Sequence, residues 1–293
     1  MDDDIKEKYL QAGRIASQVR EESRKWVFVG KSLLELAEQI ESAIKEKGGE
    51  PAFPVNLSIN DISAHYTPTK NDSSVIKEKD VIKVDIGVHV DGYIADTAYT
   101  VSFNDKYNYL VDAVKNALKE AIKMCTPGTT IAEISGKIEE TIRSFGCNPV
   151  SNLTGHGLER FTEHTDPEIP NVKINSSYML KEDQVIAIEP FATSGEGRVK
   201  DTETILIFML SERKPVRNPD ARKIIEFVER FNGLPFAERW IPLSLFKIRI
   251  ALRELRQRGV IYDYPILKEV SNGVVAQYEH TVIVKDKPII ITE

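Results

Sequence analysis

The stretch that decides the fold covers residues 81–101 and reads VIKVDIGVHV, then DG, then YIADTAYTV. Apolar residues alternate with polar residues or glycine over the first ten positions, which is the period of a β-strand. Asp91-Gly92 is typical of a two-residue hairpin turn, so the residues that follow should return antiparallel to the first strand. The sequence therefore predicts a long β-hairpin.

The hairpin register brings two aspartates onto one face. With the turn centred on Asp91-Gly92, Asp85 pairs with Ala98 and Asp96 pairs across from residue 87. The two aspartates are then diagonal neighbours, about 7–8 Å apart at the backbone. Converging carboxylates repel and raise each other's pKa unless a cation lies between them. The alternative is a pair of solvated aspartates on the exposed face of an edge hairpin, and a bulge in the turn would separate them.

Three more residues could complete a site with this pair. His156 lies between two glycines, where the imidazole can be presented from a strand end. Glu189 ends an apolar strand and is followed by Pro190, and Glu279 lies inside another alternating strand. A carboxylate within an apolar strand is unfavourable unless it is paired or coordinated.

The combined set consists of four carboxylates and one imidazole, and contains no thiolate. These ligands suit Mn, Fe(II), Co or Zn and differ from those of a structural zinc site. Four carboxylates offset two dications, which favours a dinuclear hydrolytic centre. The predicted metal ligands are Asp85, Asp96, His156, Glu189 and Glu279.

The rest of the chain has helical and strand patterns in alternation. We expect helices at 5–19, 32–48, 106–124, 130–146, 220–231 and 243–257. We expect strands at 184–191, 199–210, 274–284 and 288–292, and a loop at 51–70. The helical block interrupts a β-rich region, so residues 207–264 are predicted to be an inserted subdomain. The main domain then comprises residues 1–206 and 265–293.

Composition excludes several classes of protein. The chain has 293 residues, and its 45 acidic against 39 basic side chains argue against a protein that coats nucleic acid or anionic membranes. No stretch has the length and apolar character of a signal peptide or a membrane span. Cys125 and Cys147 form no motif, which fits a reducing compartment. We expect a soluble cytoplasmic protein.

Five segments in order resemble the metal-ligand motifs of the methionine aminopeptidases. They are Asp85, Asp96 eleven residues later, GHG at 155–157, AIEPF at 187–191 and AQYEHT at 276–281. The likeness covers essentially the whole chain. His164 eight residues after His156, the segment AHYTP at 64–68 and the insertion resemble the type 2 subfamily, and the absence of a long charged extension resembles its archaeal members.

This resemblance implies an α+β, pita-bread fold. Two pseudo-symmetric halves of antiparallel sheet would be covered by helices and would hold the metals in a central cleft. The insertion would be a small, helical, winged-helix-like subdomain. Asp85 would chelate one metal, His156 and Glu189 the other, and Asp96 and Glu279 would bridge them.

The resemblance also implies an activity and the residues that perform it. Two divalent ions (Co, Mn, Fe(II) or Zn) would activate a hydroxide that releases the N-terminal methionine from nascent polypeptides with a small second residue. His65, His164 and Glu189 would be catalytic, and His65 and His164 would also contact the substrate. Phe53 and Tyr264 would line an apolar methionine pocket. His89 and His280 would have no such role.

The partners implied are nascent N-termini and, transiently, the ribosome. We expect a monomer that binds neither membranes nor specific nucleic acid. Arginines near residues 249–258 are interspersed with glutamates, so we expect the insertion to be a lid beside the cleft that carries Tyr264, rather than an RNA-binding unit.

Two other functions remain open at this stage. A related pita-bread peptidase that cleaves X-Pro dipeptides would share the same ligands. A non-catalytic homologue that binds ribosomes or RNA would typically lose ligands and gain basic tails, whereas this chain keeps five candidate ligands and a net charge of −6.

Overall fold

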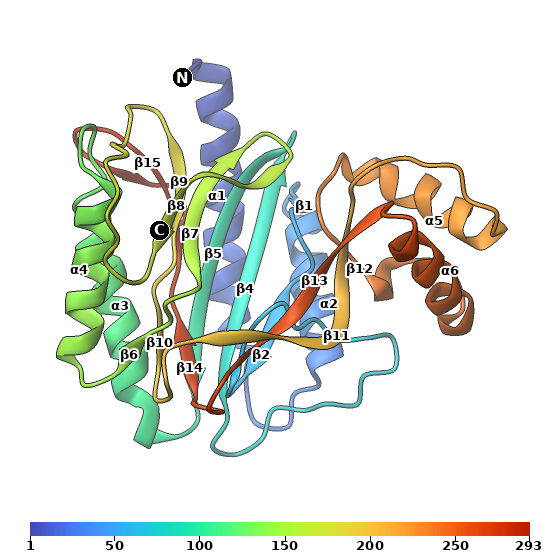
Figure 1. The fold of residues 1–293 in the computed structure, drawn as a ribbon, viewed down its shortest axis with the longest axis horizontal. Helices are drawn as coiled ribbons and strands as arrows, with labels where there is room; N and C mark the ends of the chain where they lie inside the picture. The colour runs from blue at the N-terminus through green and yellow to red at the C-terminus, as the bar shows by residue number, and fades with distance from the viewer.

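The N-terminal half of the protein is an antiparallel sheet covered by two helices (Figure 1). The structure is a computed structural model that describes all 293 residues. The elements of this half are α1 (Asp3–Ser23), α2 (Leu33–Glu46), β1 (Glu50–Pro51), β2 (Asn56–Ile59), β4 (Val81–Val90) and β5 (Tyr93–Ser102). The apolar faces of both helices join the sheet in one cluster of 30 buried residues.

The register of the β4–β5 hairpin is the predicted one. Asp85 pairs with Ala98, and Gly87 pairs with Asp96. β4 is also paired along its other edge, with β1 and β2. β4 is therefore central in its sheet, and although β5 pairs with β4 alone, Asp96 on β5 is buried.

The C-terminal half repeats this plan with two helices and two sheets (Figure 1). Its helices are α3 (Asn108–Ile122), which follows the 3-10 turn η1 (Asp105–Tyr107), and α4 (Ile131–Ser144). A capping box between Thr130 and Glu133 begins α4, as predicted. One sheet comprises β6 (Asn148–Pro149), β10 (Phe191–Thr193) and β14 (Val275–Gln277). The other comprises β7 (Thr154–Glu159), β8 (Thr162–Pro170), β9 (Val185–Ile188), β15 (His280–Ile283) and β16 (Ile289–Ile290).

The C-terminal half has a core of its own, although the first cluster also includes residues of its strands, such as Val185 and Ile283. A second cluster of 24 buried residues packs α3 and α4 against the C-terminal sheets. The predicted α+β, pita-bread architecture of two helix-covered halves is confirmed.

Four local predictions were wrong. The predicted loop at 51–70 contains β2 and β3 (Ile62–Ala64), whose hydrogen-bond partners lie far away in the chain. The predicted strand at 274–284 is interrupted at Tyr278 and Glu279, and the one at 184–191 is interrupted at Glu189 and Pro190. His156 lies inside β7 and not at a strand end. Alternation identifies strand-forming residues, but ladder partners decide where a short strand begins and ends.

Residues near the predicted insertion form a lobe beside the main body (Figure 1). It contains α5 (Pro219–Val228), η2 (Glu229–Phe231), β12 (Phe236–Ala237), η3 (Glu238–Trp240) and α6 (Leu245–Gln257). The long strands β11 (Val199–Leu210) and β13 (Ile261–Glu269) pair with each other and connect it to the body. Fourteen buried residues between Phe208 and Ile261 make up its own apolar cluster.

A buried ion pair fastens the lobe to the body. Arg239 of η3 binds Glu41 of α2 and also donates to Thr67 Oγ1. Trp240 Nε1 donates to Glu41 Oε2 over 2.9 Å, and Val55 N donates to Glu41 Oε1 over 3.2 Å. We refer to Glu41, Arg239 and Trp240 as the lobe anchor. Separately, no helix of the protein combines the length and the hydropathy that a membrane crossing requires.

Candidate metal centre

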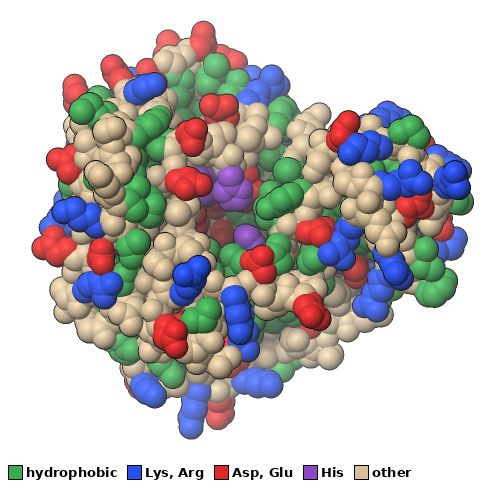
Figure 2. Space-filling model, in the orientation of Figure 1, with side chains coloured by type: hydrophobic (Ala, Val, Ile, Leu, Met, Phe, Trp, Pro, Cys, Tyr) green, Lys and Arg blue, Asp and Glu red, His purple; other side chains and the backbone are tan.

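The predicted site residues meet at one cavity. Its volume is about 830 Å³, and it lies where the two halves and the lobe adjoin. Figure 2 shows histidine side chains in this hollow, with acidic side chains around it. All the residues predicted for the site line the cavity: Phe53, His65, Asp85, Asp96, His156, His164, Glu189, Tyr264 and Glu279.

Each candidate ligand comes from a different part of the sheets. Asp85 lies on β4, Asp96 on β5 and His156 on β7. Glu189 follows β9, and Glu279 follows β14, in the two interruptions described above. An interrupted strand frees these two residues from strict alternation, so their side chains can reach the cavity.

The ligand atoms of the candidate centre converge. One ligand atom each from Asp96, His156 and Glu279 lies within 4.8 Å of the other two. His156 Nε2 is 3.5 Å from Glu189 Oε1 and 3.9 Å from Asp96 Oδ2. This spacing can accommodate a cation that shares oxygen and nitrogen ligands.

Gln277 contacts three of the four carboxylates through its side-chain amide. Its Nε2 donates to Asp85 Oδ2 at 3.4 Å, to Glu189 Oε2 at 3.3 Å and to Glu279 Oε2 at 3.3 Å. The sequence reasoning missed this residue, although Gln277 lies two positions before Glu279 in an alternating stretch. One amide cannot neutralise three carboxylates.

The electrostatics of the centre require positive charge. Burial raises the pKa of Asp85 to about 7. Burial also raises the pKa values of the other three acids well above the usual range, and repulsion from neighbouring acids raises them further; these three are Asp96, Glu189 and Glu279. No lysine or arginine forms an ion pair with any of the four. Asp85 Oδ1, Asp96 Oδ1 and Glu279 Oε1 are buried and have no hydrogen-bond partner. Free buried oxygens in such number fit divalent cations.

His156 is suited to the role of a nitrogen ligand. Burial lowers its pKa to about 4, so the imidazole is neutral at physiological pH. Its Nδ1 donates to the carbonyl of Gly157 over 3.2 Å. That bond leaves the Nε2 lone pair directed toward the carboxylates, as a metal ligand requires.

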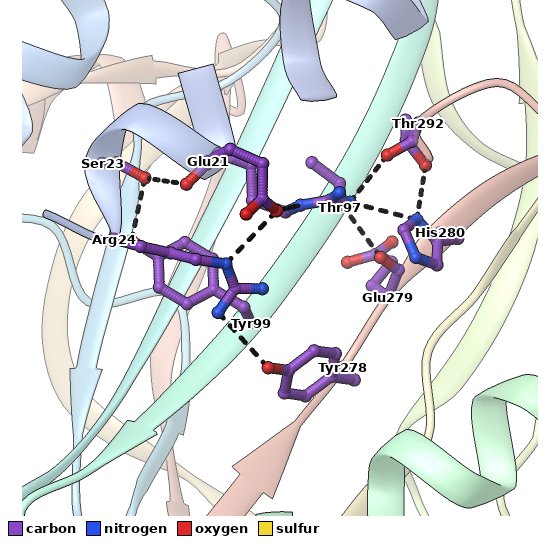
Figure 3. Close-up of polar contacts among 10 residues, drawn as sticks. Glu21, Ser23, Arg24, Thr97, Tyr99, Tyr278, Glu279, His280 and Thr292 are labelled. Carbon is purple, nitrogen blue, oxygen red and sulfur yellow. Dashed lines mark hydrogen bonds and ion pairs between the residues drawn. The ribbon is translucent and has the colours of Figure 1, made fainter. Parts of the chain in front are cut away.

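Hydrogen bonds behind the centre hold the backbone of two candidate ligands. Thr97 Oγ1 donates to the carbonyl of Glu279 over 2.9 Å, and Arg20 donates to Thr97 Oγ1 over 3.0 Å (Figure 3). Asp96 N donates to Thr281 Oγ1 over 2.7 Å, and that hydroxyl donates to the Asp96 carbonyl over 2.8 Å. These bonds join β5 of one half to the C-terminal strands of the other.

His280 and His89 lie outside the cavity. His280 Nδ1 is 2.8 Å from Thr292 Oγ1 in the network of Figure 3. His89 Nδ1 accepts a bond from Gly92 N in the hairpin turn, over 3.2 Å. Both side chains therefore have local structural partners.

The other two histidines adjoin Tyr264. The ring of His65 is 5.5 Å from that of Tyr264 and nearly perpendicular to it, and the His164 ring is 6.4 Å away. His65 Nδ1 donates to the Pro265 carbonyl over 3.0 Å, which fixes the ring. Desolvation lowers the pKa of His65, and desolvation together with the neighbouring imidazoles lowers that of His164 to about 3, so both rings are neutral. The one N–H of His65 is already donated to Pro265, whereas His164 keeps an N–H that can be donated.

Phe53 is accommodated by a glycine. A Cβ atom on Gly87 would overlap the ring of Phe53, so only glycine at this position of β4 leaves room for the aromatic side chain. The signal was visible in the sequence as a glycine inside an otherwise regular strand.

The cavity also contains Glu163, an acid that the sequence reasoning did not name. It directly precedes His164, and alternation would direct neighbouring residues to opposite faces. A register irregularity between β7 and β8 alters that rule here.

Comparisons with known proteins agree with this architecture. The model of metallopeptidase family M24 matches residues 7–286. The chain is 50% identical to a methionine aminopeptidase of Thermococcus onnurineus, over 99% of both chains. It is 47% identical to one of Methanocaldococcus jannaschii, over 98% of this chain and 97% of that protein.

Solved structures share the fold at lower identity. A methionine aminopeptidase from Thermotoga maritima superposes with a TM-score of 0.74 at 23% identity, over 100% of this chain and 98% of that one. A thermophilic Arx1 gives a TM-score of 0.89 at 18% identity, over 99% and 91% of the chains. A prolidase from Pyrococcus furiosus gives 0.64 at 18% identity, over 100% and 64%.

Proposed function

Because the chain belongs to metallopeptidase family M24, we propose that it releases the N-terminal methionine from polypeptides whose second residue is small. The observation that carries this proposal is the group of four buried carboxylates and one neutral imidazole, without a basic partner, in one cavity. Full-length relatives named methionine aminopeptidase support the choice of substrate.

We propose that two divalent ions bind here. Asp85 would hold one ion, His156 and Glu189 the other, and Asp96 and Glu279 both. Such ions, when bound, supply a hydroxide nucleophile near neutral pH and polarise the scissile carbonyl. Four carboxylates balance the charge of two dications, and Co, Mn, Fe(II) and Zn all accept these ligands.

The protein's own groups would act around the scissile bond. His164 would donate its imidazole N–H to the oxyanion that develops on the carbonyl, and neutral His65 also adjoins Tyr264. Glu189, whose pKa is raised by burial, can carry a proton to the leaving amine. Phe53 and Tyr264 would contact the side chain of the first residue.

We propose further that the enzyme is of type 2. The spacing of His156 and His164, the AHYTP segment and the lobe support this assignment. Residues 207–264 would form the inserted subdomain, which the separate apolar cluster of the lobe supports. Its role would be to wall the cavity, to which β13 contributes Tyr264.

The substrates would be nascent chains in the cytoplasm, reached by a monomeric enzyme that contacts the ribosome transiently. The alternative of an X-Pro dipeptidase draws on the prolidase fold, which this chain also shares. Identity near 50% to the methionine enzymes favours the methionine activity.

The test is metal-dependent release of the first residue from three peptides: Met-Gly-x, Met-Leu-x and x-Pro. Enzyme stripped with chelator and reloaded separately with Mn, Co, Fe(II) or Zn should release methionine from Met-Gly-x much faster than from Met-Leu-x. Cleavage of x-Pro alone would favour the dipeptidase. Absence of cleavage with every metal would contradict both activities.

A further inference from the structure

Glu163 is a buried acid that the proposed metal centre does not require. It lies on β8, its side chain is 13% exposed, and it lines the cavity. Its Oε2 is buried without a hydrogen-bond partner. Its Oε1 is 3.8 Å from His164 Nε2, beyond hydrogen-bond distance.

A β-bulge turns this side chain into the cavity. Gly157 pairs with Thr165, and Glu159 pairs with Thr162, so β8 contains one more residue than β7 between these pairs. Glu163 and His164 together face one residue of β7, and both line the cavity. Bulges of this kind re-aim side chains beside active sites.

The surroundings of Glu163 disfavour its ionised form. Burial, and secondarily repulsion from Asp85, raises its pKa to about 8. It also contributes to the raised pKa of Tyr264 on the other wall. The four carboxylates of the centre already offset two dications, so charge balance does not call for Glu163 as a further ligand. A buried acceptor without a partner calls for a donor from elsewhere.

The rest of the cavity wall has the same sign of charge. Asp201 and Glu203 of β11 are exposed and line it, as does Asp263. Arg256 is the one basic residue of the lining, and it is bound to Asp263 over 2.6 Å. With two dications in place, the cavity therefore keeps an acidic wall that attracts cationic groups.

We propose that Glu163 is a specificity-determining residue, and that its free carboxylate oxygen receives a hydrogen bond from the first side chain of the substrate. The cavity then accepts a first residue that ends in an N–H donor, such as lysine, better than an apolar side chain of the same stem. This inference rests on the proposed aminopeptidase function and extends its substrate range beyond methionine.

The physical reason is the asymmetry of buried hydrogen bonds. An ammonium group supplies the donor that Oε2 lacks and stabilises the ionised carboxylate, whereas a methyl group leaves the buried acid without a partner. Norleucine and lysine share a four-carbon stem and differ only by the ammonium group, which makes them a matched pair of first residues.

The experiment compares peptides X-Gly-x, with X as methionine, norleucine or lysine, on Mn-loaded enzyme. The ratio of kcat/KM for lysine over norleucine should fall by about tenfold or more in Glu163→Leu, since a lost buried hydrogen bond to a charged group has about that effect. Glu163→Gln keeps an acceptor oxygen without the charge and should lie between the two. Glu168→Leu, an exposed position of the same strand, is the matched control and should leave the ratio unchanged.

Two readouts separate the ways in which the idea could fail. An unchanged lysine-to-norleucine ratio in Glu163→Leu, with methionine still released, contradicts the role of Glu163 alone. No release of methionine by the wild type contradicts the proposed function. Calorimetric titration with Mn should give the same stoichiometry for wild type and Glu163→Leu, and loss of one equivalent would make Glu163 a metal ligand instead.

Discussion

The protein buries acidic side chains in two regions, and the regions treat them in opposite ways. In the lobe anchor, both oxygens of Glu41 have partners: Arg239, Trp240 and the backbone of Val55. In the candidate metal centre, Asp96 and Glu279 are buried as deeply, and one oxygen of each has no partner.

The two regions differ in whether the fold itself supplies the positive charge that balances the buried acids. The anchor contains its own counter-charge, so the Glu41 carboxylate is neutralised within the fold and the pair holds the lobe against the body. The centre contains four acids, one amide and one neutral imidazole, so its counter-charge must come from outside. A buried acid indicates a binding site only when its partners are missing.

The largest expected effect comes from removing a ligand. His156→Ala or Glu279→Ala should reduce methionine release below detection in steady-state assays, because each removes a proposed metal ligand. The metal-free Glu279→Ala protein should melt no lower than the metal-free wild type, since an uncompensated acid has been removed. Release at near-normal rate by either variant would show that the ligand assignment is wrong.

Removing a charged group from the lobe anchor should lower the stability of the protein, whereas removing an acid from the metal centre should not. Arg239→Met should destabilise the protein by about 3–5 kcal/mol, because it leaves the Glu41 carboxylate buried without a counter-charge. Replacing both partners, Glu41→Leu with Arg239→Met, should restore much of that stability. Denaturant unfolding measures both changes, and equal losses in the single and double variants would argue against coupling.

The stability of the metal-free protein should depend on pH through the acids of the metal centre, which have no counter-charge. The pKa of Asp85 is raised to about 7 in the folded state, so this group takes up protons on folding between about pH 4 and pH 7. Its contribution to stability is present below pH 4 and is lost as the pH rises through 7. Melting temperatures with chelator should therefore fall over this range, and added Mn should reduce the slope.

The smallest effect concerns the amide that contacts three acids. Gln277→Ala should weaken metal binding by about 10–100-fold, as is usual for groups that orient ligands, while leaving the metal stoichiometry unchanged. Isothermal titration with Mn measures both quantities. Gln277→Glu would add a further acid to the centre, and it should lower the melting temperature of the metal-free protein.

Much of the site was accessible from local patterns. The hairpin turn fixed the pairing of Asp85 with Ala98, and the structure has that register. The same alternation did not locate β2 or the ends of β14, because short strands form where a distant partner supplies hydrogen bonds. Glu163 was hidden for a related reason, since a bulge reverses the side to which a residue points.

The sequence by itself determined which residues could form a metal centre, because carboxylates inside apolar strands need a partner wherever the chain takes them. It also determined the main hairpin, since a two-residue turn leaves one register. Only the tertiary structure decided which charges were neutralised. Arg239 reaches Glu41 across 198 positions, whereas no basic group reaches Glu279. Counter-charge depends on distances in space, which alternation and spacing do not encode.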